Sequence, residues 1–154
     1  MDSLPELLFS EAADASQSKR VRRLAAAGRL KKLYAGVYTS NVDAPPEFVV
    51  LRNWRAITSH LLPQGEISHR SAFDGRPHDG RLVVTRGNKR RTIALPGLAV
   101  EVFPGPGPST DGLQADYPYG DLYLSGEPRR FLENLTRGRG WAVRIKGVRV
   151  EINA

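Results

Sequence analysis

The stretch SKRVRRLAAAGRLKKLYAGVYTS, residues 18–40, concentrates the positive charge of the chain. It holds no acidic residue and seven basic ones: Lys19, Arg20, Arg22, Arg23, Arg29, Lys31 and Lys32. The 154-residue chain has a formal net charge of +7, and outside this stretch 16 basic residues face 16 acidic ones. Because the excess is local, it indicates a local polyanionic partner, with nucleic acid favoured over a membrane surface.

The spacing of apolar residues predicts a helix followed by a hairpin. Val21, Leu24 and Ala25 share one helical face, Ser16 is the expected N-cap, and Gly28 is a natural terminator. On the opposite face or its flank lie the basic residues Lys19, Arg20, Arg22 and Arg23. Apolar residues on both sides of Ala35-Gly36 then predict two short strands.

A first helix is predicted over residues 2–15, where Leu4, Leu7 and Leu8 fall on one face. Two successive helices and a hairpin predict a winged helix-turn-helix over residues 1–44. Groove contacts are expected from the start of the second helix: Ser16, Gln17, Lys19, Arg20 and Arg23. Phosphate contacts are expected from its flank and the wing: Arg22, Arg29, Lys31, Lys32 and Tyr34.

The remainder, residues 45–154, predicts a mixed α/β unit with a mainly antiparallel sheet, so the expected fold class is α+β. A helix over 46–62 connects the two units, with Phe48, Leu51 and Trp54 among its predicted buried residues. Two strands at 82–85 and 91–94 are predicted to form a hairpin that turns at Gly87-Asn88. A third strand at 98–103, a fourth at 121–124 and a helix capped near Ser125 follow.

The composition excludes several classes of protein. Cys is absent, which excludes disulfides, zinc–thiolate sites and thiol catalysis. No run of residues reaches the ~18 apolar positions that span a bilayer, and the N-terminus does not read as a secretory signal. We therefore expect a cytoplasmic protein.

The three histidines form no recognisable catalytic or metal motif. His60, His69 and His78 lack the i, i+4 spacing of a helical metal site, and no catalytic residue, metal or cofactor is predicted. His69 is expected to serve local packing, capping or hydrogen bonding. An enzyme that uses His69 is retained only as a third hypothesis.

Residues 20–40 resemble the winged helix that opens AbiEi-type antitoxins, in which an arginine-rich helix precedes a wing of the form RxxxGVY. The matching positions are Leu24, Gly28, Leu30, Lys31, Gly36, Val37 and Tyr38. ISHRSAFDG, residues 67–75, and LYLSGEPRRFLENL, residues 122–135, are similar to later segments of that family. The resemblance implies a winged helix that binds the promoter of its own operon, and a second domain that neutralises a nucleotidyltransferase-like toxin.

A weaker resemblance links residues 124–144 to the region ahead of the catalytic domain in large Fic proteins. The Fic signature HxFx(D/E)GNGR is absent, so this resemblance implies an accessory module without adenylyl-transfer chemistry.

A second basic patch occurs at Arg86, Lys89, Arg90 and Arg91. A charged turn that discourages edge pairing and a further phosphate contact explain it equally well. The leading functional hypothesis is an antitoxin-like autorepressor that binds double-stranded DNA, as a dimer if its operator is two-fold. The alternative is a protein-interaction module that binds a toxin or partner enzyme.

Overall fold

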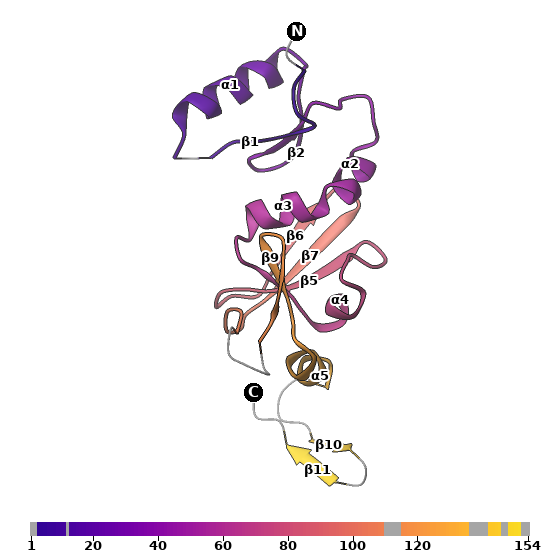
Figure 1. The fold of residues 1–154 in the computed structure, drawn as a ribbon. Helices are drawn as coiled ribbons and strands as arrows, with labels where there is room; N and C mark the ends of the chain where they lie inside the picture. Colours follow the sequence, from indigo (N-terminus) through magenta and orange to yellow (C-terminus); the bar gives the residue numbers. More distant parts are fainter. Residues whose placement is uncertain (1–2, 12, 110–114, 136–141, 146–147, 152–154) are drawn as a thin grey trace.

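The protein is described here from a computed structural model, which covers residues 3–11, 13–109, 115–135, 142–145 and 148–151 (Figure 1). The helices are α1 (Ala15–Ala26), α2 (Pro46–Arg52), α3 (Trp54–Leu61), α4 (His69–Asp74) and α5 (Glu127–Leu135). The strands are β1 (Leu7–Phe9), β2 (Lys31–Tyr34), β3 (Val37–Thr39), β4 (Glu66–Ile67), β5 (Arg81–Thr85), β6 (Arg91–Leu95), β7 (Leu98–Phe103), β8 (Tyr117–Tyr119), β9 (Leu122–Leu124), β10 (Ala142–Ile145) and β11 (Val148–Glu151). The fold class is α+β, as predicted.

The first 40 residues form a three-stranded antiparallel sheet with α1 across it. The strand order is β1-β3-β2, and Leu7 lies opposite Thr39 while Phe9 lies opposite Val37. The predicted first helix is therefore wrong, and none of the described residues before Ala15 is helical. The physical reason is strand alternation: Leu8 packs under α1, whereas Leu7 and Phe9 face the main core.

The second sheet has six strands in the order β6-β7-β5-β4-β9-β8. It is mixed, because β5 runs parallel to β7 and β4 runs parallel to β9, while the other pairs are antiparallel. The predicted hairpin at Gly87-Asn88 is wrong, since β7 lies between β5 and β6. The tight turn is instead at Pro96-Gly97, where Gly97 adopts a φ of 71° and joins β6 to β7.

The predicted connecting helix over 46–62 is two helices that meet at Asn53. The Asn53 side chain donates to the Val49 carbonyl at 2.9 Å and to Glu6 Oε2 at 2.9 Å, and its backbone leaves helical geometry with φ −112° and ψ 21°. This is the competition that Asn side chains offer to a regular helix. Phe48 and Leu51, predicted to be buried, are 64% and 42% exposed, because α2 buries Val49 and Val50 instead.

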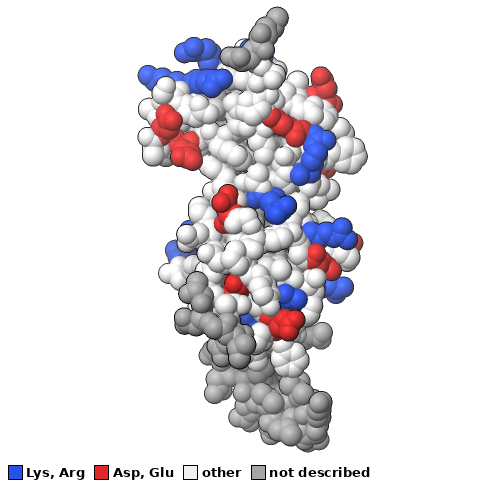
Figure 2. Space-filling model, viewed as in Figure 1, with Lys and Arg blue, Asp and Glu red and all other residues white. Residues whose placement is uncertain are grey.

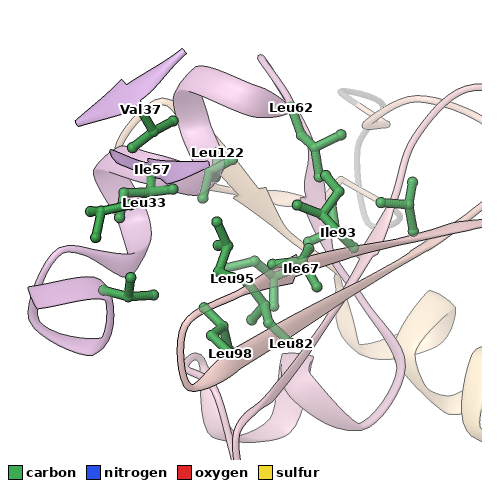
Figure 3. Close-up of a cluster of buried hydrophobic side chains, with 14 of the residues drawn as sticks. Leu33, Val37, Ile57, Leu62, Ile67, Leu82, Ile93, Leu95, Leu98 and Leu122 are labelled. Atoms are coloured by element: carbon green, nitrogen blue, oxygen red, sulfur yellow. The ribbon is translucent and has the colours of Figure 1, made fainter. Parts of the chain in front are cut away.

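One hydrophobic core joins both sheets. Leu33 and Val37 of the β2–β3 hairpin belong to the same buried cluster as Val49 of α2, Ile57 of α3 and Leu95 of the large sheet. Figure 3 shows Leu33 and Val37 beside Ile57, with residues of the large sheet packed beyond. In Figure 1, α2 and α3 lie between the small sheet and the large one, and α4 packs against β5 and α5 on the side away from α3.

A polar contact reinforces this junction. The carboxylate of Glu6, just before β1, pairs with Arg52 at the end of α2 and also accepts hydrogen bonds from Asn53 Nδ2 at 2.9 Å and Asn41 Nδ2 at 3.3 Å. His60 of α3 stacks on Phe9 of β1 at a ring distance of 4.2 Å. The hydrogen bond from Arg52, followed by that from Asn53, holds the pKa of Glu6 at about 2, below its ordinary 4.5.

None of the described helices is both long and apolar enough to cross a lipid bilayer.

Replacing Glu6 with Gln should lower the free energy of unfolding by about 1 kcal/mol at pH 7, after allowance for solvent screening. Because the pKa of Glu6 is lowered on folding, its contribution is complete above pH 4.5 and is lost as the pH falls toward 2. Urea unfolding at pH 7 and at pH 2.5 measures this difference. Glu11→Gln, at an exposed position, is the matched control; an equal loss in that variant would contradict the assignment.

Candidate nucleic-acid interface

Helix α1 forms because its ends are well defined and its interior suits a helix. Asp14, not the predicted Ser16, is the N-cap, and its Oδ1 accepts a hydrogen bond from the Gln17 backbone at 2.9 Å. The run of Arg, Leu and Ala has high helix propensity. Gly28, with a φ of 74°, ends the helix as predicted, and the Arg29 backbone N–H donates to the Leu24 carbonyl at 3.0 Å.

The two faces of α1 have opposite character, as the sequence predicts. Val21 is fully buried and packs with Leu8 of β1 and Leu30, while Leu24 and Ala25 are partly buried against the same cluster. The exposed side chains include the four basic residues Lys19, Arg20, Arg22 and Arg23. Figure 2 shows Lys and Arg side chains gathered over α1 at one end of the molecule.

The hairpin extends this basic surface. Arg29 precedes β2, and Lys31 and Lys32 lie on it, all three exposed. Gly36 turns the hairpin with a φ of 76°, and a Cβ at this position would lie 3.0 Å from the Ser10 carbonyl oxygen. Tyr34 is half-buried and packs against the main core, so it offers only part of its ring to a ligand.

The basic residues of this surface have no acidic partner within the described structure. The ion pairs of the described residues involve Glu6, His78, Arg81 and Arg129. None of these pairs includes any of the seven basic residues of 18–40. Of the two remaining predicted contact residues, Ser16 is exposed and Gln17 is half-buried near the start of α1. We call the surface formed by α1, Arg29 and β2 the basic face. It presents concentrated, uncompensated positive charge, as a polyanion requires.

The second basic patch lies elsewhere, on the connection between β5 and β6 and at the first residue of β6. Arg86, Lys89, Arg90 and Arg91 are all exposed there. Two of them also have structural contacts: Arg86 Nε donates to the Pro63 carbonyl at 2.8 Å, and the Arg90 guanidinium lies 4.4 Å from the centre of the Phe103 ring. This patch therefore belongs to the large sheet and does not extend the basic face.

The structure also contains a buried polar cluster that the sequence patterns did not identify. Glu66 of β4 is fully buried and forms an ion pair with Arg129 of α5, with 2.7 Å between Oε2 and Nη1. Asp116 and Glu133 contact the same guanidinium. The one available signal was the i, i+4 spacing of Arg129 and Glu133, which is common on helices and carries little specificity.

His69 takes part in local hydrogen bonding and packing, as predicted. Its Nδ1 lies 2.9 Å from Ser68 Oγ, its backbone N–H donates to Glu133 at 3.0 Å, and its ring packs on Phe103 at 4.9 Å. Burial is the main cause that lowers its pKa. Among the described residues, no group of three or more His, Cys, Asp or Glu side chains has an arrangement that could hold a metal ion.

A cavity of about 260 Å³ lies near His78 and is lined by side chains of both charges, including Arg70, Asp79 and Arg81. Arg81 pairs with Glu101 across the parallel strands β5 and β7. His69 is not among the lining residues, so the cavity does not support the hypothesis of an enzyme that uses this histidine.

Comparisons with models of known protein families, with curated proteins and with solved structures found no match to this chain.

The double variant Arg20→Ala/Arg23→Ala should leave the free energy of unfolding within about 0.5 kcal/mol of the wild type, because both side chains are exposed and form no ion pair with any residue that the structure describes. Val21→Ala, on the buried face between them, should cost about 1–3 kcal/mol through the cavity that it leaves. Urea unfolding at pH 7 compares the variants. A large loss in the arginine variant would mean that the basic face is structural.

Proposed function

We propose that the protein is a DNA-binding transcriptional regulator that binds duplex DNA through the basic face. The observation that carries this proposal is the exposure of seven basic side chains on α1 and the adjoining hairpin without acidic partners in the described structure. Contact between these side chains and DNA phosphates favours binding, because it releases the counterions condensed on DNA. The proposed location is the cytoplasm.

Helix α1 has the dimensions of a groove-binding helix. Its 12 residues span about 18 Å, and the major groove of B-DNA is wide enough to admit one helix. In this arrangement the base edges are contacted by Lys19, Arg20 and Arg23. Arg and Lys side chains recognise guanine in the major groove. Lys31 and Lys32 on the hairpin then contact the phosphate backbone.

The proposal keeps the winged-helix interpretation but changes its first element. A helix followed by a hairpin, with β1 completing the small sheet, supports α1 as the recognition helix and β2–β3 as the wing. The support that a preceding helix gives in a helix-turn-helix is supplied here by β1, through Leu8. With the resemblance to AbiEi-type antitoxins, this favours an autorepressor that binds its own operator. A two-fold operator would be bound by a homodimer.

A salt titration of duplex binding tests the proposal directly. Contact with five to seven phosphates predicts a slope of log K against log[salt] of about −4.5 to −6. Arg20→Ala/Arg23→Ala should abolish measurable binding at physiological salt. Fluorescence anisotropy with a labelled duplex from upstream of the gene, and with a scrambled duplex of equal length, measures affinity and sequence preference together.

The matched control for this experiment is Arg70→Ala/Arg76→Ala, which removes the same charge from exposed positions in or beside α4. It should bind DNA almost as the wild type does. Equal losses of duplex affinity in the two double variants would mean that DNA is attracted by the overall positive charge of the protein and not by the basic face. A third variant, Arg86→Ala/Arg91→Ala, tests the second basic patch. If the slope of log K against log[salt] is unchanged in this variant, the patch is a charged turn that discourages edge pairing and not a phosphate contact.

A second candidate, a protein-interaction module, is favoured by a different observation. Phe73 of α4 is 60% exposed, and Phe131 and Leu132 of α5 are each 50% exposed. These two helices pack together, so they present apolar side chains from neighbouring elements. Exposed aromatic side chains are typical anchors of protein interfaces.

If a nucleotidyltransferase-like toxin is encoded beside this gene, Phe73→Ser/Phe131→Ser should weaken toxin binding at least tenfold and leave duplex affinity unchanged. Isothermal titration calorimetry with the purified toxin measures the first quantity, and anisotropy measures the second. Unchanged toxin affinity in this variant would remove α4 and α5 from the interface.

A further inference from the structure

The side chain of Glu66 is enclosed between β4, the start of α5 and the segments that flank them. It is fully buried. Its Oε1 lies 2.8 Å from Ser125 Oγ, within hydrogen-bond distance, and its Oε2 lies 2.7 Å from Arg129 Nη1 without the geometry of a hydrogen bond. A buried carboxylate is costly to ionise unless both oxygens are well satisfied.

The neighbouring carboxylates accept more hydrogen bonds than Glu66 does. Asp116 accepts backbone hydrogen bonds from Ser109 and Gly126, each at 2.8 Å, and contacts Arg129 at 3.2 Å. Glu133 accepts from Arg129 Nε at 3.0 Å and from the His69 backbone at 3.0 Å. Since one guanidinium contacts all three carboxylates, Glu66 is the one that most readily keeps a proton, and burial is the main cause that raises its pKa to about 7.

The position of Ser125 also indicates a proton on one of the two carboxyl groups beside it. Its Oγ lies 2.8 Å from Glu66 Oε1 and 3.0 Å from Glu133 Oε2, yet a hydroxyl has one proton to donate. If Glu66 carries a proton on Oε1, it donates to Ser125 Oγ, and Ser125 donates to Glu133 Oε2. The contact between Glu66 and Ser125 and the contact between Ser125 and Glu133 then each have one donor and one acceptor.

We propose that Glu66 is a protonation switch, in which the neutral carboxyl donates through Ser125 to Glu133 and its ionisation loosens the docking of α5. Arg129 couples this docking to the segment after β7, because its Nη2 and Nη1 donate to the carbonyls of Pro106 and Gly107 at 2.8 and 3.1 Å. A rise in pH therefore weakens the attachment of α5 and of this segment together.

The groups that face the switch come from each element packed around it. They are Glu66 of β4, Asp116 before β8, Ser125 before α5, Arg129 and Glu133 of α5, Ser68 and His69 at the start of α4, and Thr85 of β5. His69 faces Glu133 with its backbone N–H, and its lowered pKa keeps the imidazole neutral above its ordinary value of 6.5. The switch lies outside the basic face and does not depend on DNA binding.

The sign of the effect follows from linkage. Unfolded Glu66 releases its proton near 4.5, whereas folded Glu66 holds it to about 7. Its stabilising contribution is complete below pH 4.5 and falls as the pH rises through 7, so opening of α5 should increase about tenfold between pH 6 and pH 8.

Two measurements on the full chain test the switch. The ¹³C carboxyl resonance of Glu66 should titrate near pH 7, and a midpoint near 4.5 would overturn the proposal without any variant. Amide hydrogen exchange, corrected for intrinsic rates, should show the protection of residues 127–135 falling about tenfold from pH 6 to pH 8 in the wild type.

In Glu66→Gln, which mimics the neutral carboxyl, this protection should be the same at both pH values. In the control His69→Asn, the tenfold fall should persist. A fall that persists in Glu66→Gln, or disappears in His69→Asn, would assign the pH response to another group and contradict the proposal.

Discussion

Strand β3 is the element on which the N-terminal unit depends, because both β1 and β2 pair with it and with no other described strand. Its first residue, Val37, is fully buried in the core shared with α2 and α3. The same strand therefore closes the small sheet and attaches it to the rest of the protein. Helix α1 packs on this sheet through Val21, which contacts Leu8 and Leu30, and Ser18 adds hydrogen bonds to Ser10 and to the Glu11 carbonyl.

The sequence predicted well those elements whose signals are local. The helical period of Val21, Leu24 and Ala25 and the turn at Ala35-Gly36 lie within 16 residues, and helix α1 and the hairpin both form as these signals predict. Strand β1 could not be predicted, because three residues become a strand only by pairing with β3 some 30 residues later. Before that pairing is known, neighbouring Leu7 and Leu8 fit a helix as well as a strand.

Two further features depend on distant partners and were missed for that reason. Gly87-Asn88 has the composition of a hairpin turn, but β7 pairs with both β5 and β6 and separates them. Glu66 looks in sequence like a surface residue, yet Ser125 and Arg129 surround it from about 60 positions away. The exposed basic residues lie on one helix and the hairpin that follows it, so the basic face could be predicted from local sequence. The buried cluster joins residues distant in the chain and could not be predicted in this way.

The two polar systems suggest different uses because their charges are compensated differently. Hydrated cations on the basic face cost the fold little, so their concentration on one helix and one hairpin has no structural explanation within the described residues. Around Arg129, by contrast, three carboxylates share one guanidinium inside the protein, and a change of one proton must be absorbed by the contacts of α5. The basic face is therefore suited to an external ligand, whereas the Glu66 cluster responds to conditions that alter its own protonation. Since a shared core and the Glu6–Arg52 contact fix the small sheet on α2, the basic face has a defined orientation relative to the exposed side chains of α4 and α5.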